Sequence, residues 1–173
     1  MPSFSAFLRI RMEMEACTVE KPCPLGTDTE KPTAVCFVCT GNTCRSPMAA
    51  AVLNALGKGE YKAVSAGISA IRGDVISKNS VSALKKAGIE STPDNDYESH
   101  RALQISEELI ERCDKIVAIS KSHFMALICA FPQYAERITV MSRDIADPFL
   151  RGEEVYDECL RQITECVKEM FAV

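Results

Sequence analysis

The fold is decided by the stretch Ala34-Val35-Cys36-Phe37-Val38-Cys39-Thr40-Gly41-Asn42-Thr43-Cys44-Arg45-Ser46-Pro47. Its first six residues form a short apolar run, which is typical of a strand buried on both faces of a parallel sheet. Its last residue, Pro47, is the first of the alanine-rich segment 47–56. This segment predicts a helix with proline at the first helical position. The sequence therefore predicts a strand, a tight loop and a helix in direct succession.

Strands and helices alternate along the rest of the chain. The expected strands are 61–65, 115–119 and 138–140, and the expected helices are 79–87, one opening at Ser106, 122–130 and 155–171. The last helix is expected to bury one face, made of Val155, Cys159, Ile163, Cys166 and Met170. Such alternation predicts an α/β fold with helices on both faces of a mostly parallel sheet. Ligands of these sheets bind beyond the carboxyl ends of strands, so the loop after 34–39 is the first candidate site.

The beginning of the chain differs in composition from the remainder. Residues 1–32 contain four prolines and no sustained period, which predicts a poorly ordered N-terminal extension to a single domain at 33–173. Met12 and Met14 are alternative starting points of the chain. The length of 173 residues suits one α/β domain.

Composition also argues against several classes of function. The net charge of −4 argues against a nucleic-acid-binding protein, which would normally carry an excess of basic residues. No apolar run is long enough to cross a bilayer and no signal peptide is evident, so a cytoplasmic protein without a membrane partner is expected. An odd number of cysteines, nine, beside only two histidines argues against a structural zinc site. We therefore expect most cysteines to be inert and one to carry chemistry.

Each residue type in the loop has a physical role if the ligand is a phosphate. Cys39 ends the strand where backbone N–H groups and a helix N-terminus converge, and these favour a nucleophilic thiolate. Arg45 can turn back to present its planar fork to phosphoryl oxygens. Gly41 lets the backbone approach the anion, and Asn42 tolerates a left-handed conformation. Ser46 can donate a hydrogen bond to the thiolate.

Phosphoryl transfer also needs a proton donor for the leaving group and a base for the attacking water. One carboxylate can serve as both in turn. Asp147-Pro148-Phe149 follows the last predicted strand, in a connection that could reach the same end of the sheet. The sequence therefore predicts Asp147 as acid and base, with Phe149 as a wall of the pocket and Asp144 as the rival carboxylate.

The loop and the distant Asp-Pro-Phe together resemble the low-molecular-weight protein tyrosine phosphatase family, from about Val35 to the C-terminal helix. Further motifs of the resemblance are Val64-Ser65-Ala66-Gly67, Ser99-His100 and Cys113-Asp114-Lys115-Ile116-Val117. The resemblance implies a four-stranded parallel sheet in three αβα layers, with the phosphate-binding loop after the first strand. It also implies a cysteinyl-phosphate intermediate on Cys39, formed without metal or cofactor.

The resemblance further implies the surroundings of the nucleophile. Substrate contacts would come from Thr40, Gly41, Asn42, Thr43, Cys44, Ser46 and Phe149. A polar network of Asn42, Ser46, Ser65 and His100 would support the loop. The expected partner is a phosphorylated protein, with inorganic phosphate or a similar oxyanion held in the loop, and the protein would be a monomer or weak dimer. His123, inside an apolar helix, is interpreted as structural.

The choice of substrate within the family depends on a few positions. Thr43 is typical of the protein-arginine phosphatase branch, because a guanidinium tolerates or uses a hydroxyl where a phenyl ring favours an apolar wall. Phe149, in place of the tyrosine common after Asp-Pro, points the same way. So does Ile71, at a position where tyrosine-directed members often carry an aromatic residue. Arg151, in Leu150-Arg151-Gly152, points instead to acidic phosphopeptides. These observations favour phosphoarginine, with phosphotyrosine as the alternative.

Three other hypotheses are open at this stage. An arsenate reductase on the same fold would need a cysteine pair, where residues 119–122 offer serines. A phosphoprotein-binding module without catalysis would not need Cys39, Arg45 and Asp147 together. Cys44 could form a regulatory disulfide with Cys39, which would protect the nucleophile from irreversible oxidation.

Overall fold

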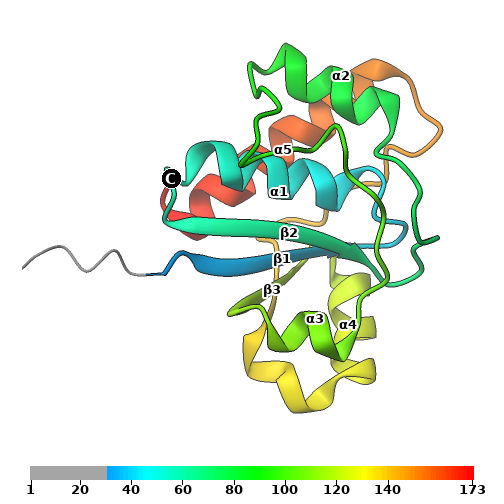
Figure 1. Cartoon of the computed structure of the whole chain (residues 1–173). Helices are drawn as coiled ribbons and strands as arrows, with labels where there is room; N and C mark the ends of the chain where they lie inside the picture. Colours follow the sequence, from blue (N-terminus) through cyan, green and yellow to red (C-terminus); the bar gives the residue numbers. More distant parts are fainter. Residues whose placement is uncertain (1–30) are drawn as a thin grey trace, which may run out of the picture. The chain divides into compact units, whose positions relative to one another are not determined.

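The structure, a computed structural model, describes residues 31–173 (Figure 1). The prediction of a poorly ordered extension at 1–32 therefore falls almost entirely outside the described residues. Strands and helices alternate as expected. In chain order they are β1 Thr33–Cys39, α1 Arg45–Leu56, β2 Tyr61–Gly67, α2 Lys78–Lys86, α3 Glu107–Glu111, β3 Lys115–Ala118, α4 Lys121–Ala130, a 3₁₀ helix Pro132–Arg137, β4 Ile138–Val140 and α5 Glu153–Phe171.

The sheet contains four parallel strands in the order β2-β1-β3-β4. β1 therefore lies inside the sheet, paired with β2 on one side and β3 on the other. Cys39, its last residue, is opposite Gly67, the last residue of β2. The predicted four-stranded parallel α/β fold is confirmed.

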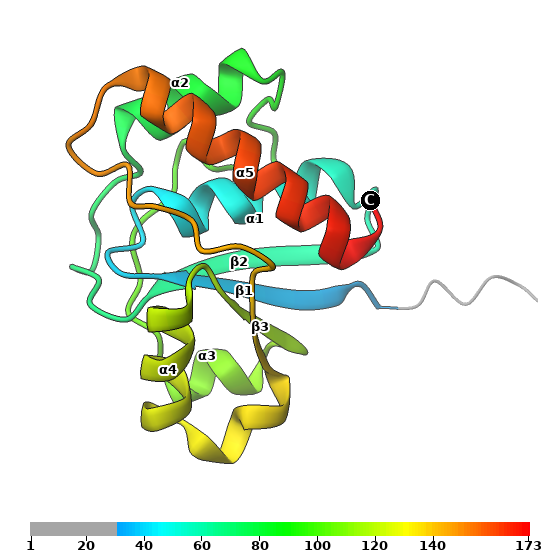
Figure 2. The same cartoon turned by 180° about the vertical axis from the view of Figure 1, so that it is seen from behind.

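Helices cover both faces of the sheet. α1, α2 and α5 lie on one face, and α3 and α4 lie on the other, as the views from front and back agree (Figures 1 and 2). Among the described helices, none is long and apolar enough to span a bilayer.

The two faces of β1 explain why its sequence is apolar without interruption. Val35 and Phe37 point into the core beneath α1 and α5, whereas Cys36 and Val38 point into the core beneath α3 and α4. Alternate residues of a strand face opposite sides, so a strand covered on both faces needs apolar residues at every position. The ring of Phe171, at the end of α5, meets that of Phe37 edge-on at 6.1 Å between centroids.

Two helices differ most from expectation at their N-terminal ends. α1 begins at Arg45 rather than Pro47, so the loop after β1 spans only residues 40–44. In α5, Val155 is 43% exposed, and the helix instead buries Tyr156 and Leu160. The predicted face of α5 was wrong at its start because Tyr156 turns inward, where its hydroxyl meets Cys44.

The helix predicted to open at Ser106 is confirmed, and a glycine follows the end of α2. Ser106 caps α3, its hydroxyl accepting from the Leu109 N–H at 3.3 Å. Gly88, just beyond α2, adopts the left-handed conformation with φ of 75°.

Gly67 allows β2 to approach the loop after β1 closely. A Cβ atom at this position would overlap the carbonyl oxygen of Thr40 and lie 3.0 Å from the backbone nitrogen of Asn42. Both of these are backbone atoms, which cannot move aside without distorting the loop. The glycine is therefore required by packing against the candidate site.

We predict that Gly67→Ala lowers the free energy of unfolding by about 1–3 kcal/mol, because overpacking against backbone forces the loop to shift. Urea denaturation measures the loss. Gly152→Ala is the matched control, since a Cβ there meets no atom within 4 Å. Equal stability of the two variants would contradict the prediction.

Candidate active site

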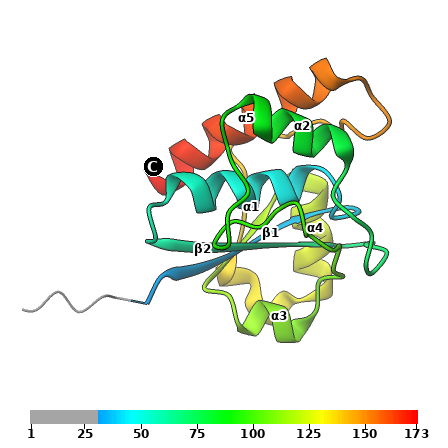
Figure 3. The ribbon, with the colours of Figure 1, turned by 45° about the horizontal axis from the view of Figure 1, so that its top comes forward.

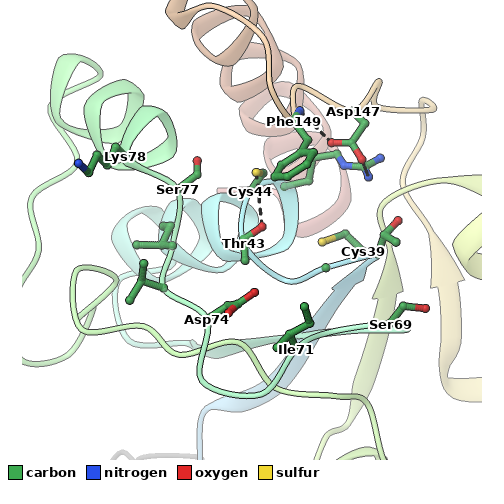
Figure 4. A pocket seen from close by; sticks show the side chains of 15 residues that line it. Cys39, Thr43, Cys44, Ser69, Ile71, Asp74, Ser77, Lys78, Asp147 and Phe149 are labelled. Atoms are coloured by element: carbon green, nitrogen blue, oxygen red, sulfur yellow. Dashed lines mark hydrogen bonds and ion pairs between the residues drawn. The ribbon is translucent and has the colours of Figure 1, made fainter.

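Three segments from distant parts of the chain meet beyond the carboxyl end of β1. They are the loop after β1, the segment that leads from β2 to α2, and the loop that leads into α5, all on the same side of the domain (Figure 3). They enclose a cavity of about 540 Å³. Its lining residues are Cys39, Thr40, Gly41, Thr43, Cys44, Arg45, Ser69, Ile71, Asp74, Val75, Ile76, Ser77, Lys78, Asp147 and Phe149 (Figure 4).

Cys39 is buried, and its sulfur has one close polar neighbour. The Sγ atom lies 3.0 Å from Oγ of Ser46, in the first turn of α1. Asn42 Nδ2 donates to the same Ser46 oxygen at 3.0 Å, which leaves the hydroxyl hydrogen for other acceptors. The two candidates are the Cys39 sulfur and the carbonyl of Ala66, at 3.2 Å from the hydroxyl. Because a thiolate only accepts hydrogen bonds, ionisation of Cys39 would draw the Ser46 hydrogen to sulfur.

Asn42 holds the loop in its closed shape. It is completely buried, with φ of 56°, so the predicted left-handed conformation is present. Its Nδ2 also donates to Ser65 Oγ at 2.9 Å, and its Oδ1 accepts from the Leu103 N–H at 2.9 Å. Every hydrogen-bonding group of this amide is therefore used.

His100 also supports the loop, through a contact with its backbone. Its Nε2 lies 2.8 Å from the carbonyl oxygen of Asn42, which can only accept, so Nε2 must carry the hydrogen. Burial lowers the pKa of His100 below its ordinary value. A neutral ring that donates from Nε2 thus braces the loop, and the structure joins Asn42, Ser46, Ser65 and His100 in one network.

Arg45 reaches the cavity and contacts the predicted acid. One terminal nitrogen lies 2.5 Å from Oδ2 of Asp147, and the other donates to the carbonyl of Ile145 at 3.2 Å. Asp147 Oδ1 accepts from the Phe149 N–H at 3.1 Å, which fixes the carboxylate in the Asp-Pro-Phe turn. The Nε of Arg45 is buried and has no partner within residues 31–173. A buried donor of this kind is suited to a phosphoryl oxygen.

The rival carboxylate serves another purpose. Asp144 Oδ1 accepts from the Lys121 N–H at 2.7 Å, at the start of α4. Asp144 does not line the cavity, whereas Asp147 does. The geometry therefore favours Asp147 as the proton carrier.

The predicted substrate contacts divide into two groups. Thr40, Gly41, Thr43, Cys44 and Phe149 line the cavity, but the side chains of Asn42 and Ser46 are buried behind it. These two brace the loop instead of lining the pocket, because their polar groups are used within the network. A Cβ at Gly41 would meet only Thr43 Oγ1, at 3.8 Å, so protein packing does not require this glycine.

Cys44 lies in the wall of the cavity, with its sulfur 3.3 Å from the hydroxyl of Tyr156. Burial, with the hydrogen bond to Cys44 next, raises the pKa of Tyr156 to about 12. Both Cys39 and Cys44 are free thiols here. The regulatory disulfide between them stays a prediction.

His123 touches the loop, which the sequence did not indicate. Its Nε2 lies 2.9 Å from Thr40 Oγ1, and its Nδ1 lies 2.7 Å from Oγ of Ser120, the cap of α4. Burial, followed by the charge of Arg45, lowers the pKa of His123 to about 4. The ring is therefore neutral near pH 7 and orients the residue that follows the nucleophile.

Sequence reasoning also missed four polar residues of the segment after β2. They are Ser69, Asp74, Ser77 and Lys78, all of which line the cavity. A signal was present: parallel strands end at the same edge of the sheet, so the residues after β2 and β3 belong near those after β1.

The sequence and the structure were compared with those of known proteins. The family described as low molecular weight phosphotyrosine protein phosphatase matches residues 34–173. The chain belongs to this family. It is therefore a protein phosphatase, a hydrolase, and the resemblance inferred from the loop is confirmed.

Its relatives in this family carry two kinds of name. A protein-arginine-phosphatase of Geobacillus stearothermophilus is 35% identical over 132 residues, covering 72% of this chain and 84% of the relative. Among solved structures, the YwlE arginine phosphatase of Geobacillus stearothermophilus is 32% identical with a TM-score of 0.72, covering 80% of this chain and 90% of the other. A low molecular weight protein tyrosine phosphatase of T. tengcongensis is 34% identical with a TM-score of 0.74, covering 81% and 98%.

We predict that His123→Gln flattens the dependence of stability on pH. Between pH 6.5, the ordinary pKa of histidine, and about 4, its value in the native phosphatase, only the unfolded chain binds a proton at His123. The free energy of unfolding of the wild type must therefore fall as the pH decreases through this window. Urea titrations at pH 7.5, 6 and 5 measure the slope. An unchanged slope in the variant would contradict the assigned pKa.

Proposed function

We propose that this phosphatase removes the phosphoryl group from phosphoarginine side chains of proteins, using Cys39 as nucleophile, Arg45 as phosphate ligand and Asp147 as proton carrier. The observation that carries the choice of substrate is Thr43. Its side chain lines the cavity that Cys39 also lines, with the hydroxyl 3.7 Å from the Cys44 sulfur (Figure 4). Relatives named as arginine phosphatases support the same choice.

In the first step the Cys39 thiolate attacks phosphorus, forming an S–P bond while the N–P bond to the guanidino group breaks. The electron pair of that bond stays on nitrogen, and Asp147 gives its proton to this leaving nitrogen. Arg45 neutralises charge on the phosphoryl oxygens with its fork, including the buried Nε. The products are an arginine side chain and a cysteinyl phosphate.

In the second step Asp147, now a carboxylate, takes a proton from water. The water oxygen forms a bond to phosphorus while the S–P bond breaks, which releases phosphate and restores the thiolate. Ser46 supports this departure, because its hydroxyl lies 3.0 Å from the Cys39 sulfur and can donate to it.

Phosphotyrosine is the second candidate substrate, and the apolar rim of the cavity is compatible with it. Ile71, Val75 and Phe149 line the cavity and are 57–70% exposed. An apolar rim of this kind can pack on a phenyl ring, and also on the aliphatic stem and the flat guanidinium of arginine. The rim alone therefore does not select between the two substrates.

We predict that Cys39→Ser lowers kcat on phosphoarginine and phosphotyrosine peptides by at least about a thousandfold. Asp147→Asn should lower it by about a hundredfold, because the amide cannot transfer the proton. Asp144→Asn is the matched control, since the amide oxygen can still accept from the Lys121 N–H. Activity of Cys39→Ser on either peptide, or equal losses in the two aspartate variants, would refute the assigned roles.

The substrate itself is tested at Thr43. Wild type should have the higher kcat/KM on phosphoarginine peptides, and Thr43→Ile should shift the ratio toward phosphotyrosine by about tenfold. Thr43→Val tests the hydroxyl alone, because the shape is kept, and Thr43→Ser retains the hydroxyl as control. Preference of the wild type for phosphotyrosine would overturn the proposed substrate and leave the mechanism intact.

A further inference from the structure

A second carboxylate lies in the wall of the cavity. Asp74, in the segment between β2 and α2, lines the same cavity as Cys39 and Asp147. Figure 4 shows its carboxyl group turned into the pocket, on the side opposite Asp147. Neither step of the proposed mechanism uses this residue.

The backbone of Asp74 is fixed, whereas its side chain is not engaged. Its N–H donates to the carbonyl of Ile71 at 3.2 Å, and its carbonyl accepts from the Ala102 N–H at 2.7 Å. The next residue, Val75, pairs with Arg101 in an antiparallel bridge. Within residues 31–173, the Asp74 carboxylate has no hydrogen-bond or ion-pair partner. Its position is therefore set by the fold, while both of its oxygens stay available to a ligand.

The two carboxylates of the cavity differ in what they can still accept. One oxygen of Asp147 faces Arg45 and the other accepts from the Phe149 N–H. Asp74 has no such partners. The lining cation nearest to it in sequence is Lys78, whose ammonium group points away from the cavity (Figure 4). Among the described residues, Asp74 therefore adds to the wall a carboxylate that makes no ion pair.

The two substrates differ in the number of N–H hydrogen-bond donors that the leaving group offers to this wall. Beyond the nitrogen bonded to phosphorus, the guanidino group of phosphoarginine carries further N–H donors in one plane, which match a carboxylate. The phenolic leaving group of phosphotyrosine carries none. A carboxylate opposite Asp147 therefore gains a partner with the first substrate and only loses hydration with the second.

We propose that Asp74 is a specificity-determining residue that accepts N–H groups of the substrate guanidinium. Together with the Thr43 hydroxyl, it selects arginine-linked phosphate over tyrosine-linked phosphate. This inference rests on the proposed phosphoarginine phosphatase function.

The test compares wild type, Asp74→Asn and Asp94→Asn on two peptides that differ only in phosphoarginine or phosphotyrosine. Asp94 is exposed, lies outside the active cavity and makes no side-chain hydrogen bond in the described residues, so its variant controls for the loss of one charge. Asp74→Asn should lower kcat/KM on phosphoarginine by about fivefold, mainly through KM, as expected for a partly exposed ion pair. Its kcat/KM on phosphotyrosine should stay equal or rise, and Asp94→Asn should change neither value.

The outcomes separate the two proposals. A wild type that hydrolyses only phosphotyrosine refutes the proposed substrate and this inference together. A wild type that prefers phosphoarginine, with a selectivity unchanged in Asp74→Asn, refutes this inference alone. An equal fall on both peptides also refutes it, because a structural role would act on both. A loss confined to phosphoarginine that shrinks at high salt supports it.

Discussion

The site depends on one buried amide. Asn42 holds the left-handed conformation that closes the loop, and it is completely buried. Its side chain donates to Ser46 and Ser65 and accepts from the backbone of Leu103, so it joins α1, β2 and the segment before α3. A buried polar group without these partners would cost free energy, so the loop is stable only in the complete domain.

This bracing separates two parts of the pocket. The floor is rigid: Cys39, Ser46 and the network behind them are buried, and their hydrogen bonds come from elements of the sheet and helices. The rim is exposed, and its residues come from connecting segments. Chemistry common to a family is suited to the floor, while the choice of substrate is suited to the rim, because rim residues can change without disturbing the network.

Local sequence was sufficient for the floor of the site. A strand buried on both faces must be apolar throughout, and a glycine, an asparagine and an arginine at fixed spacing define the loop that follows. Asp147 could be named as well, because the Asp-Pro-Phe turn follows the last strand. The errors were local and small. α1 begins at Arg45, and the buried face of α5 starts with Tyr156, because a stripe on a helix can rotate when one large side chain finds a partner.

The sequence by itself thus determined the order of strands and helices, the phosphate-binding loop with Cys39 and Arg45, and the family. The tertiary structure alone decided which distant residues surround that loop. His123 bonds to Thr40 across 83 positions of the chain, and Asp74 lines the wall opposite Asp147. The pattern around a lone histidine or aspartate gives no sign of such contacts. They arise because parallel strands bring their carboxyl ends, and whatever side chains follow them, to one edge of the sheet.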